Sequence, residues 1–252
     1  MSYPVVKTKY RYASLTSPEQ YVQQYRKHTG NAENLIVVYS KSFFNILIKN
    51  FNFKKIYQNL YFINNSYHLY LSQMGAPNIG ICVEEFSVNG YKNFFAIGIC
   101  GAINNDLKVG DIVVSNRALR DEGTSYHYLK ADNYISCDKK ILDDVEKKLK
   151  SNMIQYSKRT VWTTDAPYRE TYYEIKKNID NGVDCVDMET SAFYAVAEYR
   201  KTSAVSIFIV SDVLDVEKKK WNMSFNSKII YNNFLKIFNA IVWKINFLFV
   251  VL

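Results

Sequence analysis

The sequence predicts an α/β fold in which three layers, α/β/α, surround a mixed and mainly parallel central sheet. Short apolar runs alternate with helical patterns from about Leu35 to Val210, which is typical of βα units. The 252 residues are 48% hydrophobic, which suits one large α/β domain. Because no internal repeat or Gly/Ser linker divides the chain, we expect a single domain over residues 1–252.

Five apolar runs have the length of buried strands and stand between helical patterns. They are Leu35–Val38, Phe94–Gly98, Asp111–Val114, Val161–Thr163 and Ala204–Val210. A helix is predicted between the first two from apolar residues at the i, i+3, i+4, i+7 spacing, namely Ile79, Cys82, Val83 and Phe86. Further helices are expected over Lys139–Leu149 and from about Glu189.

The two ends of the chain are expected to form an N-terminal arm over about 1–32 and a C-terminal helix over about 227–252. Lysines interrupt the apolar C-terminal run well short of the roughly 18 uncharged residues of a membrane span, so a packed helix is favoured over a membrane-associated tail. The start lacks a secretory signal and four cysteines are scattered, so we expect a cytoplasmic protein. The net charge of +8 is spread over many segments, which favours solvated surface over a nucleic-acid partner.

Two segments after predicted strands carry residues suited to binding. Phe94–Ile103 is an apolar strand that should enter a turn at Gly98 and Gly101, where a ligand can approach the backbone, although a tight turn alone would also explain the glycines. Arg117–Tyr128 is dense in charged and hydroxyl side chains and is expected to be a loop. Arg120 there suits either a ligand contact or a salt bridge, whereas a structural role is simpler for His127.

Two later segments place carboxylates at strand ends. Asp187 and Glu189 bracket Met188 where a strand gives way to a helix, and a carboxylate can accept two hydroxyl hydrogen bonds, as a vicinal diol requires. Capping of the helix is the alternative, although one acid would suffice for it. Ser211 and Asp212 follow the last apolar run, where hydrophobic walls can raise the pKa of an acid and make it a proton donor.

In this order, the four segments resemble the nucleoside phosphorylase superfamily, which includes bacterial-type purine nucleoside phosphorylases, uridine phosphorylases and methylthioadenosine nucleosidases. The resemblance runs from about Leu35 to Phe225 and rests chiefly on Val-Asp-Met-Glu-Thr-Ser-Ala, ending at Ala192, and on Val-Ser-Asp, ending at Asp212. Further stretches are similar to a uridine phosphorylase-like subgroup: Arg120–Ser125, Trp162–Thr171 and Lys220-Trp221.

The resemblance implies a nucleoside phosphorylase-like fold and cleavage of the N-glycosidic bond of a nucleoside. The favoured reaction is phosphorolysis to base and ribose 1-phosphate, with inorganic phosphate as co-substrate and neither cofactor nor metal. A homo-oligomer, either a dimer or a hexamer, is also implied.

The resemblance also assigns residue roles. Glu189 would bind the ribose hydroxyls, with Asp187 beside it and Met188 packed on the sugar. Asp212 would protonate a purine at N7, which mildly favours a purine over uridine. The residues expected around the base are Tyr168, Arg169, Cys100 and Gly101.

The chain departs from the family at the phosphate site. Phosphorolytic members carry Gly-Asp-Pro-x-Arg where this chain has Val38–Ser42, and they carry an arginine and a small hydroxyl residue at the positions of Ala96 and Ile99. An alanine cannot replace a bidentate arginine. The remaining candidates for holding phosphate are Gly98, Ile99, Lys41 and Arg120. Two alternatives therefore stay open: a hydrolase that uses water, and a nucleoside binder without catalysis.

Overall fold

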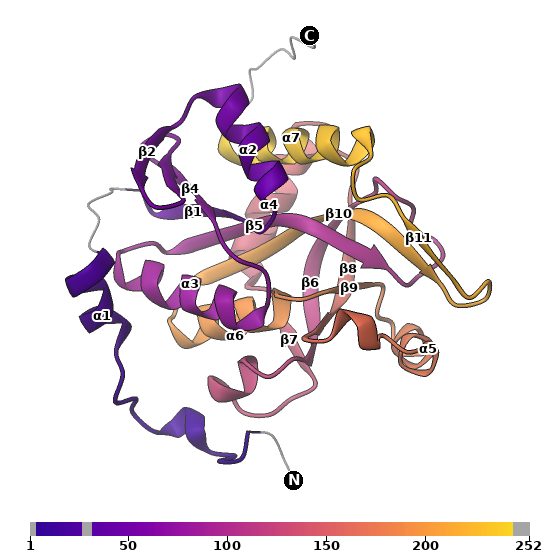
Figure 1. The fold of residues 1–252 in the computed structure, drawn as a ribbon, viewed down its shortest axis with the longest axis horizontal. Coiled ribbons are helices and arrows are strands. Elements are labelled where there is room, and N and C mark those ends of the chain that lie inside the picture. The colour runs from indigo at the N-terminus through magenta and orange to yellow at the C-terminus, as the bar shows by residue number, and fades with distance from the viewer. Residues whose placement is uncertain (1–3, 27–31, 244–252) are drawn as a thin grey trace.

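The structure, a computed structural model, describes residues 4–26 and 32–243 (Figure 1). Its strands are β1 (Asn34–Val38), β2 (Lys54–Tyr57), β3 (Leu60–Phe62), β4 (Tyr67–Leu71), β5 (Asn93–Ala102), β6 (Ile112–Asp121), β7 (Tyr134–Ser136), β8 (Ser157–Thr164), β9 (Cys185–Asp187), β10 (Ser203–Asp215) and β11 (Lys220–Met223). The α-helices are α1 (Pro18–Tyr21), α2 (Lys41–Phe51), α3 (Ala76–Val88), α4 (Lys139–Ser151), α5 (Tyr172–Asp180), α6 (Thr190–Tyr199) and α7 (Lys228–Val242). Short helical turns are η1 (Lys9–Arg11), η2 (Val22–Arg26), η3 (Ser125–His127) and η4 (Pro167–Arg169).

All the strands within the described residues belong to one mixed sheet. The central pairs β1–β5, β5–β10 and β6–β8 are parallel, while the β2–β3–β4 edge, β7 and β11 are added in antiparallel fashion. Because β10 pairs with both β5 and β6, the strands β5, β10, β6, β8 and β9 form a closed circuit. The circuit brings the ends of β5, β9 and β10 together.

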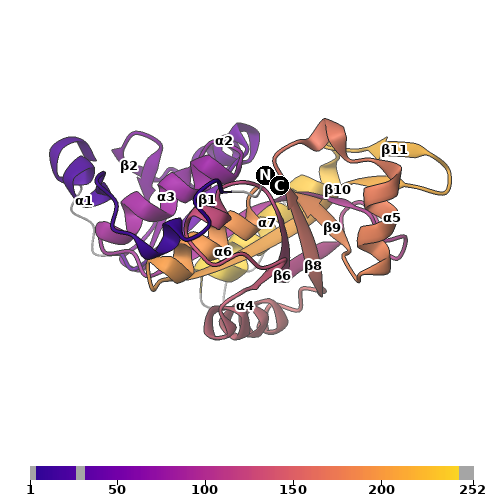
Figure 2. The ribbon, with the colours of Figure 1, turned by 90° about the horizontal axis from the view of Figure 1, so that it is seen from below.

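Helices cover both faces of the sheet, which confirms the predicted α/β class. Helices α3 and α6 pack together on one face, and α2, α4 and α7 lie on the other (Figure 1). In α4 the buried side chains are Ile141, Val145 and Leu149, at the spacing of one helical face. Helix α5 and strand β11 lie at one end of the molecule in both views (Figures 1 and 2).

Several predicted elements are present, with different limits. The predicted strand Asp111–Val114 continues as β6 to Asp121, so Arg117 and Arg120 lie in a strand and not in a loop. Likewise β5 runs through Gly98 and Gly101 to Ala102, where a turn was expected. The polar residues suggested loops, but pairing with β8 and β9 continues both strands past their apolar cores.

The chain ends are described in part. The predicted C-terminal helix is present as α7, and residues 244–252 lie outside the described residues, as do 1–3 and 27–31 of the predicted arm. None of the helices that the structure describes is long and apolar enough to cross a membrane.

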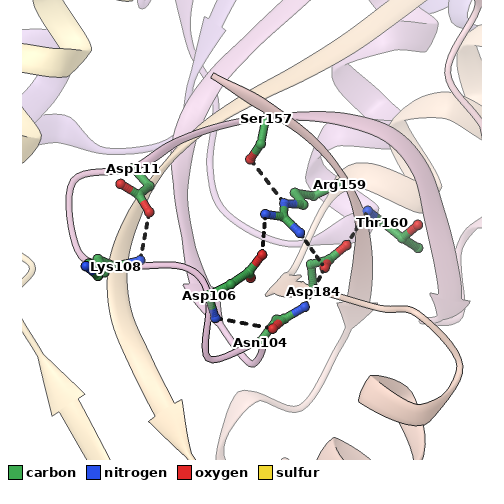
Figure 3. Close-up of polar contacts among 8 residues, drawn as sticks. All are labelled: Asn104, Asp106, Lys108, Asp111, Ser157, Arg159, Thr160 and Asp184. Atoms are coloured by element: carbon green, nitrogen blue, oxygen red, sulfur yellow. Dashed lines mark hydrogen bonds and ion pairs between the residues drawn. The ribbon is translucent and has the colours of Figure 1, made fainter. Parts of the chain in front are cut away.

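A polar cluster fixes the loop between β5 and β6 against β8 and β9 (Figure 3). Arg159 of β8 contacts Asp106 of the loop at 2.7 Å and Asp184, which precedes β9, at 3.1 Å. Asp184 also accepts hydrogen bonds from the Asn104 side chain and the Thr160 backbone N–H. Arg159 is thus engaged in holding the start of β9 against β8 and the loop.

Candidate active site

A cavity of about 590 Å³ lies where the ends of β5, β9 and β10 meet η4, α5 and β11. The size suits a small organic ligand. It gathers most of the predicted site residues: Gly98, Ile99, Cys100, Gly101, Tyr168, Asp187, Met188, Glu189 and Asp212. Residues separated by more than a hundred positions thus share one cavity, which the closed circuit of strands makes possible.

A β-bulge in β10 sets the position of Asp212. The register against β5 shifts between Val210 and Asp212, and bulges re-aim the side chains beside them. The Ser211 hydroxyl donates to Asp212 Oδ1 at 2.5 Å and lies 3.1 Å from the Cys100 carbonyl, while Trp221 Nε1 donates to Asp212 Oδ2 at 2.7 Å. Both carboxylate oxygens of Asp212 are therefore held by a hydrogen bond, although the single Ser211 proton can serve only one of Asp212 Oδ1 and the Cys100 carbonyl.

Gly101 explains how the bulge fits against β5. A Cβ atom on Gly101 would lie 3.1 Å from Asp212 Oδ2 and 2.9 Å from Leu214 Cδ1, closer than side-chain atoms normally approach. The residue is needed for close packing of strands at the cavity wall rather than for a turn.

The two carboxylates around Met188 have different surroundings. Asp187 accepts hydrogen bonds from the Thr163 and Thr190 hydroxyls and from the backbone N–H groups of Glu189 and Thr190. Glu189 accepts one from the Gly75 backbone N–H at 2.6 Å. Burial and then the Asp187 charge raise the pKa of Glu189 well above its ordinary value. Burial also raises the pKa of Asp187, although its hydrogen bonds lower it.

A tyrosine near Glu189 has a free polar atom. Tyr39 lines the cavity, and its buried hydroxyl has no hydrogen-bond partner among the described residues. Its pKa is raised by burial and by the charges of Glu189 and Asp187, so the hydroxyl stays protonated. It is positioned to exchange a hydrogen bond with a ligand in the cavity.

A second pair of carboxyl side chains in the cavity consists of Asp212 and Glu170. Glu170 directly follows η4. Glu170 lines the cavity and is half-buried. Burial and then the charge of Asp212 raise its pKa from 4.5 to about 7. Glu170 is therefore largely protonated below neutral pH.

Three predicted site residues do not line the cavity. Lys41 and Arg169 are exposed. Arg120 is buried, donates to Ser125 Oγ and to the Lys130 carbonyl at 2.9 Å each, and stacks on the Tyr126 ring. Among the described lining residues, Lys220 is the one cation, against five carboxyl side chains.

A family model described as the phosphorylase superfamily matches residues 41–242. The chain belongs to the phosphorylase superfamily. Over 146 residues it is 34% identical to a DeoD-type purine nucleoside phosphorylase from Bacillus cereus (strain ZK / E33L), covering 55% of this chain and 60% of that relative. A DeoD-type enzyme from Bacillus thuringiensis (strain Al Hakam) matches with the same identity and coverage. The aligned region thus spans less than two thirds of these relatives.

Two solved structures share the superfamily fold. An AMP nucleosidase from Bacteroides thetaiotaomicron VPI-5482 matches with a TM-score of 0.73 and 16% identity, covering 89% of this chain and 94% of that one. A uridine phosphorylase from Vibrio fischeri ES114 matches with a TM-score of 0.67 and 20% identity, covering 83% and 87%. At 16% and 20% identity, these two matches support a shared fold and no more specific property.

Several residues that line the cavity were not predicted from the sequence. Glu170 and Tyr39 were not singled out, and Trp221 was noted only as part of the resemblance. Tyr39 had a signal, because it immediately follows the first predicted strand and stands in the segment that departs from the phosphate motif. Glu170 lies within the stretch Trp162–Thr171 that resembles the uridine phosphorylase-like subgroup, but it was given no role, since an acid next to Arg169 is typical of a surface pair.

Proposed function

We propose that this protein cleaves the N-glycosidic bond of a nucleoside, with a purine favoured over uridine. One observation carries the proposal: a single cavity joins Met188, Glu189 and the unpartnered Tyr39 hydroxyl to the second pair of carboxyl side chains, Asp212 and Glu170. A sugar needs hydroxyl partners and an apolar contact, and a departing base needs a proton. The superfamily membership supports the same class of reaction.

The proposed binding mode places the ribose beside Glu189. One carboxylate oxygen of Glu189 accepts the Gly75 N–H, which leaves the group able to accept from a ribose hydroxyl. Tyr39 would complete its hydrogen bonding with the sugar, and Met188 would pack on it. The base would lie between Tyr168 and the pair Asp212 and Glu170.

The charge of the cavity favours water over phosphate as the molecule that attacks the ribose when the glycosidic bond breaks. The lining has five carboxyl side chains and one lysine, so even with Glu170 neutral its acidic groups outnumber the one cation and oppose binding of an anion such as phosphate. The candidates for holding phosphate, Lys41 and Arg120, do not line the cavity, although the Gly98 and Ile99 backbone does. We therefore propose hydrolysis to base and free ribose ahead of the phosphorolysis that the sequence favoured.

We retain two further proposals for the whole protein. It is expected to be cytoplasmic and to act as a homo-oligomer. Tyr168 and Met74 line the cavity yet are 89% and 65% exposed, as expected if a second copy of the chain shields them.

The test is incubation of the purified protein with inosine, adenosine, guanosine and uridine, each with and without inorganic phosphate. We expect base and free ribose from a purine nucleoside at equal rates in both buffers. Ribose 1-phosphate as the product would establish phosphorolysis instead. If a nucleoside binds but is not cleaved in either buffer, the protein is a nucleoside binder without catalysis and the proposed function is wrong.

A further inference from the structure

We propose that Glu170, rather than Asp212, carries the proton that passes to the departing base. The inference rests on the proposed nucleoside cleavage. It assigns a catalytic residue that the sequence motifs do not identify.

The hydrogen bonds of Asp212 argue against it as the donor. Trp221 Nε1–H points at Oδ2 and the Ser211 hydroxyl at Oδ1. An indole N–H can only donate, so a proton on Oδ2 would face another hydrogen. A proton on Oδ1 would be hydrogen-bonded to Ser211 Oγ, whose own proton would then go to the Cys100 carbonyl. Neither oxygen of Asp212 is therefore placed to offer a proton to a base.

Glu170 has the opposite surroundings. It makes no hydrogen bond or ion pair within the part of the chain that the structure describes, and it lines the cavity together with Asp212. Its place is fixed from both sides, by η4 before it and by the capping box of Thr171 and Glu174 at the start of α5 after it. A half-buried carboxyl without a partner is best accommodated as the neutral acid.

The neighbouring charges act in the same direction. The titratable groups that line the cavity with Glu170 from other elements near it are Asp212 and Asp215 of β10 and Lys220 of β11, and those of its own segment are Tyr168 and Tyr172. Asp215 is paired with Lys218 at 2.9 Å. Of these groups, Asp212 is the one whose charge raises the pKa of Glu170, after burial.

In the proposed step, Glu170 gives its proton to N7 of the purine while the C1′–N9 bond breaks, and the bonding electron pair leaves with the base. Water adds its oxygen to C1′ of the resulting oxocarbenium ion and loses a proton to solvent. Solvent then returns a proton to Glu170, so the net reaction is nucleoside and water to purine and ribose.

The test is the pH dependence of kcat/KM for inosine between pH 5 and 9, which reports groups of the free enzyme. It is measured for the wild type, Glu170→Gln, Asp212→Asn and the exposed control Glu217→Gln. We expect the wild type and the control to lose activity above about pH 7, where Glu170 ionises. Glu170→Gln should be slower by about 10²–10⁴-fold and lack this decline.

Asp212→Asn discriminates between the two acids. It should keep the alkaline decline but at lower pH, because the charge that raises the pKa of Glu170 is gone while its burial remains. If Asp212→Asn removes the decline and Glu170→Gln keeps it, Asp212 is the donor and the inference is overturned. If the wild type cleaves no nucleoside, the proposed function itself fails. Thermal unfolding of each variant verifies the fold.

Discussion

Asp187 and Glu189 are one residue apart, yet their side chains meet different partners. Asp187 accepts three hydrogen bonds from Glu189 and Thr190 at the start of α6 and one from Thr163 of β8, whereas Glu189 accepts one. Four donors nearly saturate a carboxylate, so Asp187 is suited to hold the strand-to-helix junction and Glu189 to bind a ligand. The sequence indicated both roles for this pair, and only the surrounding donors from β8 and α6 distinguish them.

Replacing Asp187 with asparagine should therefore reduce stability. The substituted side chain would keep one acceptor oxygen and turn an amide toward hydroxyl and N–H donors, leaving buried groups unpaired. We expect a loss of about 1–3 kcal/mol in the free energy of unfolding, measured by urea denaturation. Glu198→Gln, on the exposed side of α6, is the matched control and should change it little. An equally small change in Asp187→Asn would refute the structural role.

The raised pKa of Glu170 leads to a separate prediction about the stability of the fold. Its pKa is raised from 4.5 to about 7 on folding, so its ionisation opposes the folded state. Glutamine does not ionise. The difference in stability between Glu170→Gln and the wild type should be constant below about pH 4.5, grow in favour of the variant as pH rises to about 7, and level off above. Melting temperatures across this range would measure it, and a difference independent of pH would contradict the raised pKa.

The elements around the cavity show which features a sequence can predict. The apolar run of β10 was predicted over Ala204–Val210, but its extension and bulge depend on pairing with β5 and β11. The antiparallel β2–β3–β4 edge was not predicted, because its runs are brief and contain polar residues. The short β9 was predicted only as a strand that ends at Asp187, without its partners in the sheet. The motif carboxylates were found from their place at strand ends, whereas Glu170 is brought to them by η4, which has no clear sequence signal.

Strand β11 supports Asp212 through Trp221. Trp221→Phe removes the indole N–H that donates to Asp212 Oδ2 and keeps a ring against Phe225. Because Trp221 is 47% exposed, water can partly replace the donor. We expect kcat/KM for a purine nucleoside to fall by about 3- to 10-fold, less than for loss of a fully buried charged hydrogen bond. A steady-state assay that finds the wild-type value would show that the hydrogen bond is dispensable.

At the scale of the whole molecule, net charge and cavity charge have opposite signs. The chain carries +8, yet the cavity lining has five acidic side chains and one lysine. The arginines that could reverse this are used elsewhere, Arg159 in the cluster of Figure 3 and Arg120 beneath η3. Alternating strands and helices were enough to predict the α/β class. Closure of the strands, which sets the composition of the cavity, depends on long-range pairing and could not be predicted.

The most direct test of nucleoside cleavage is chromatographic detection of free base released from a purine nucleoside by the wild type, Glu189→Gln and Glu198→Gln. We predict release by the wild type and by Glu198→Gln at the same rate. Loss of the hydrogen bond between Glu189 and the ribose hydroxyls should lower kcat/KM of Glu189→Gln by about 10- to 100-fold. Absence of base from every nucleoside with the wild type, or an undiminished rate in Glu189→Gln, would contradict the proposed function.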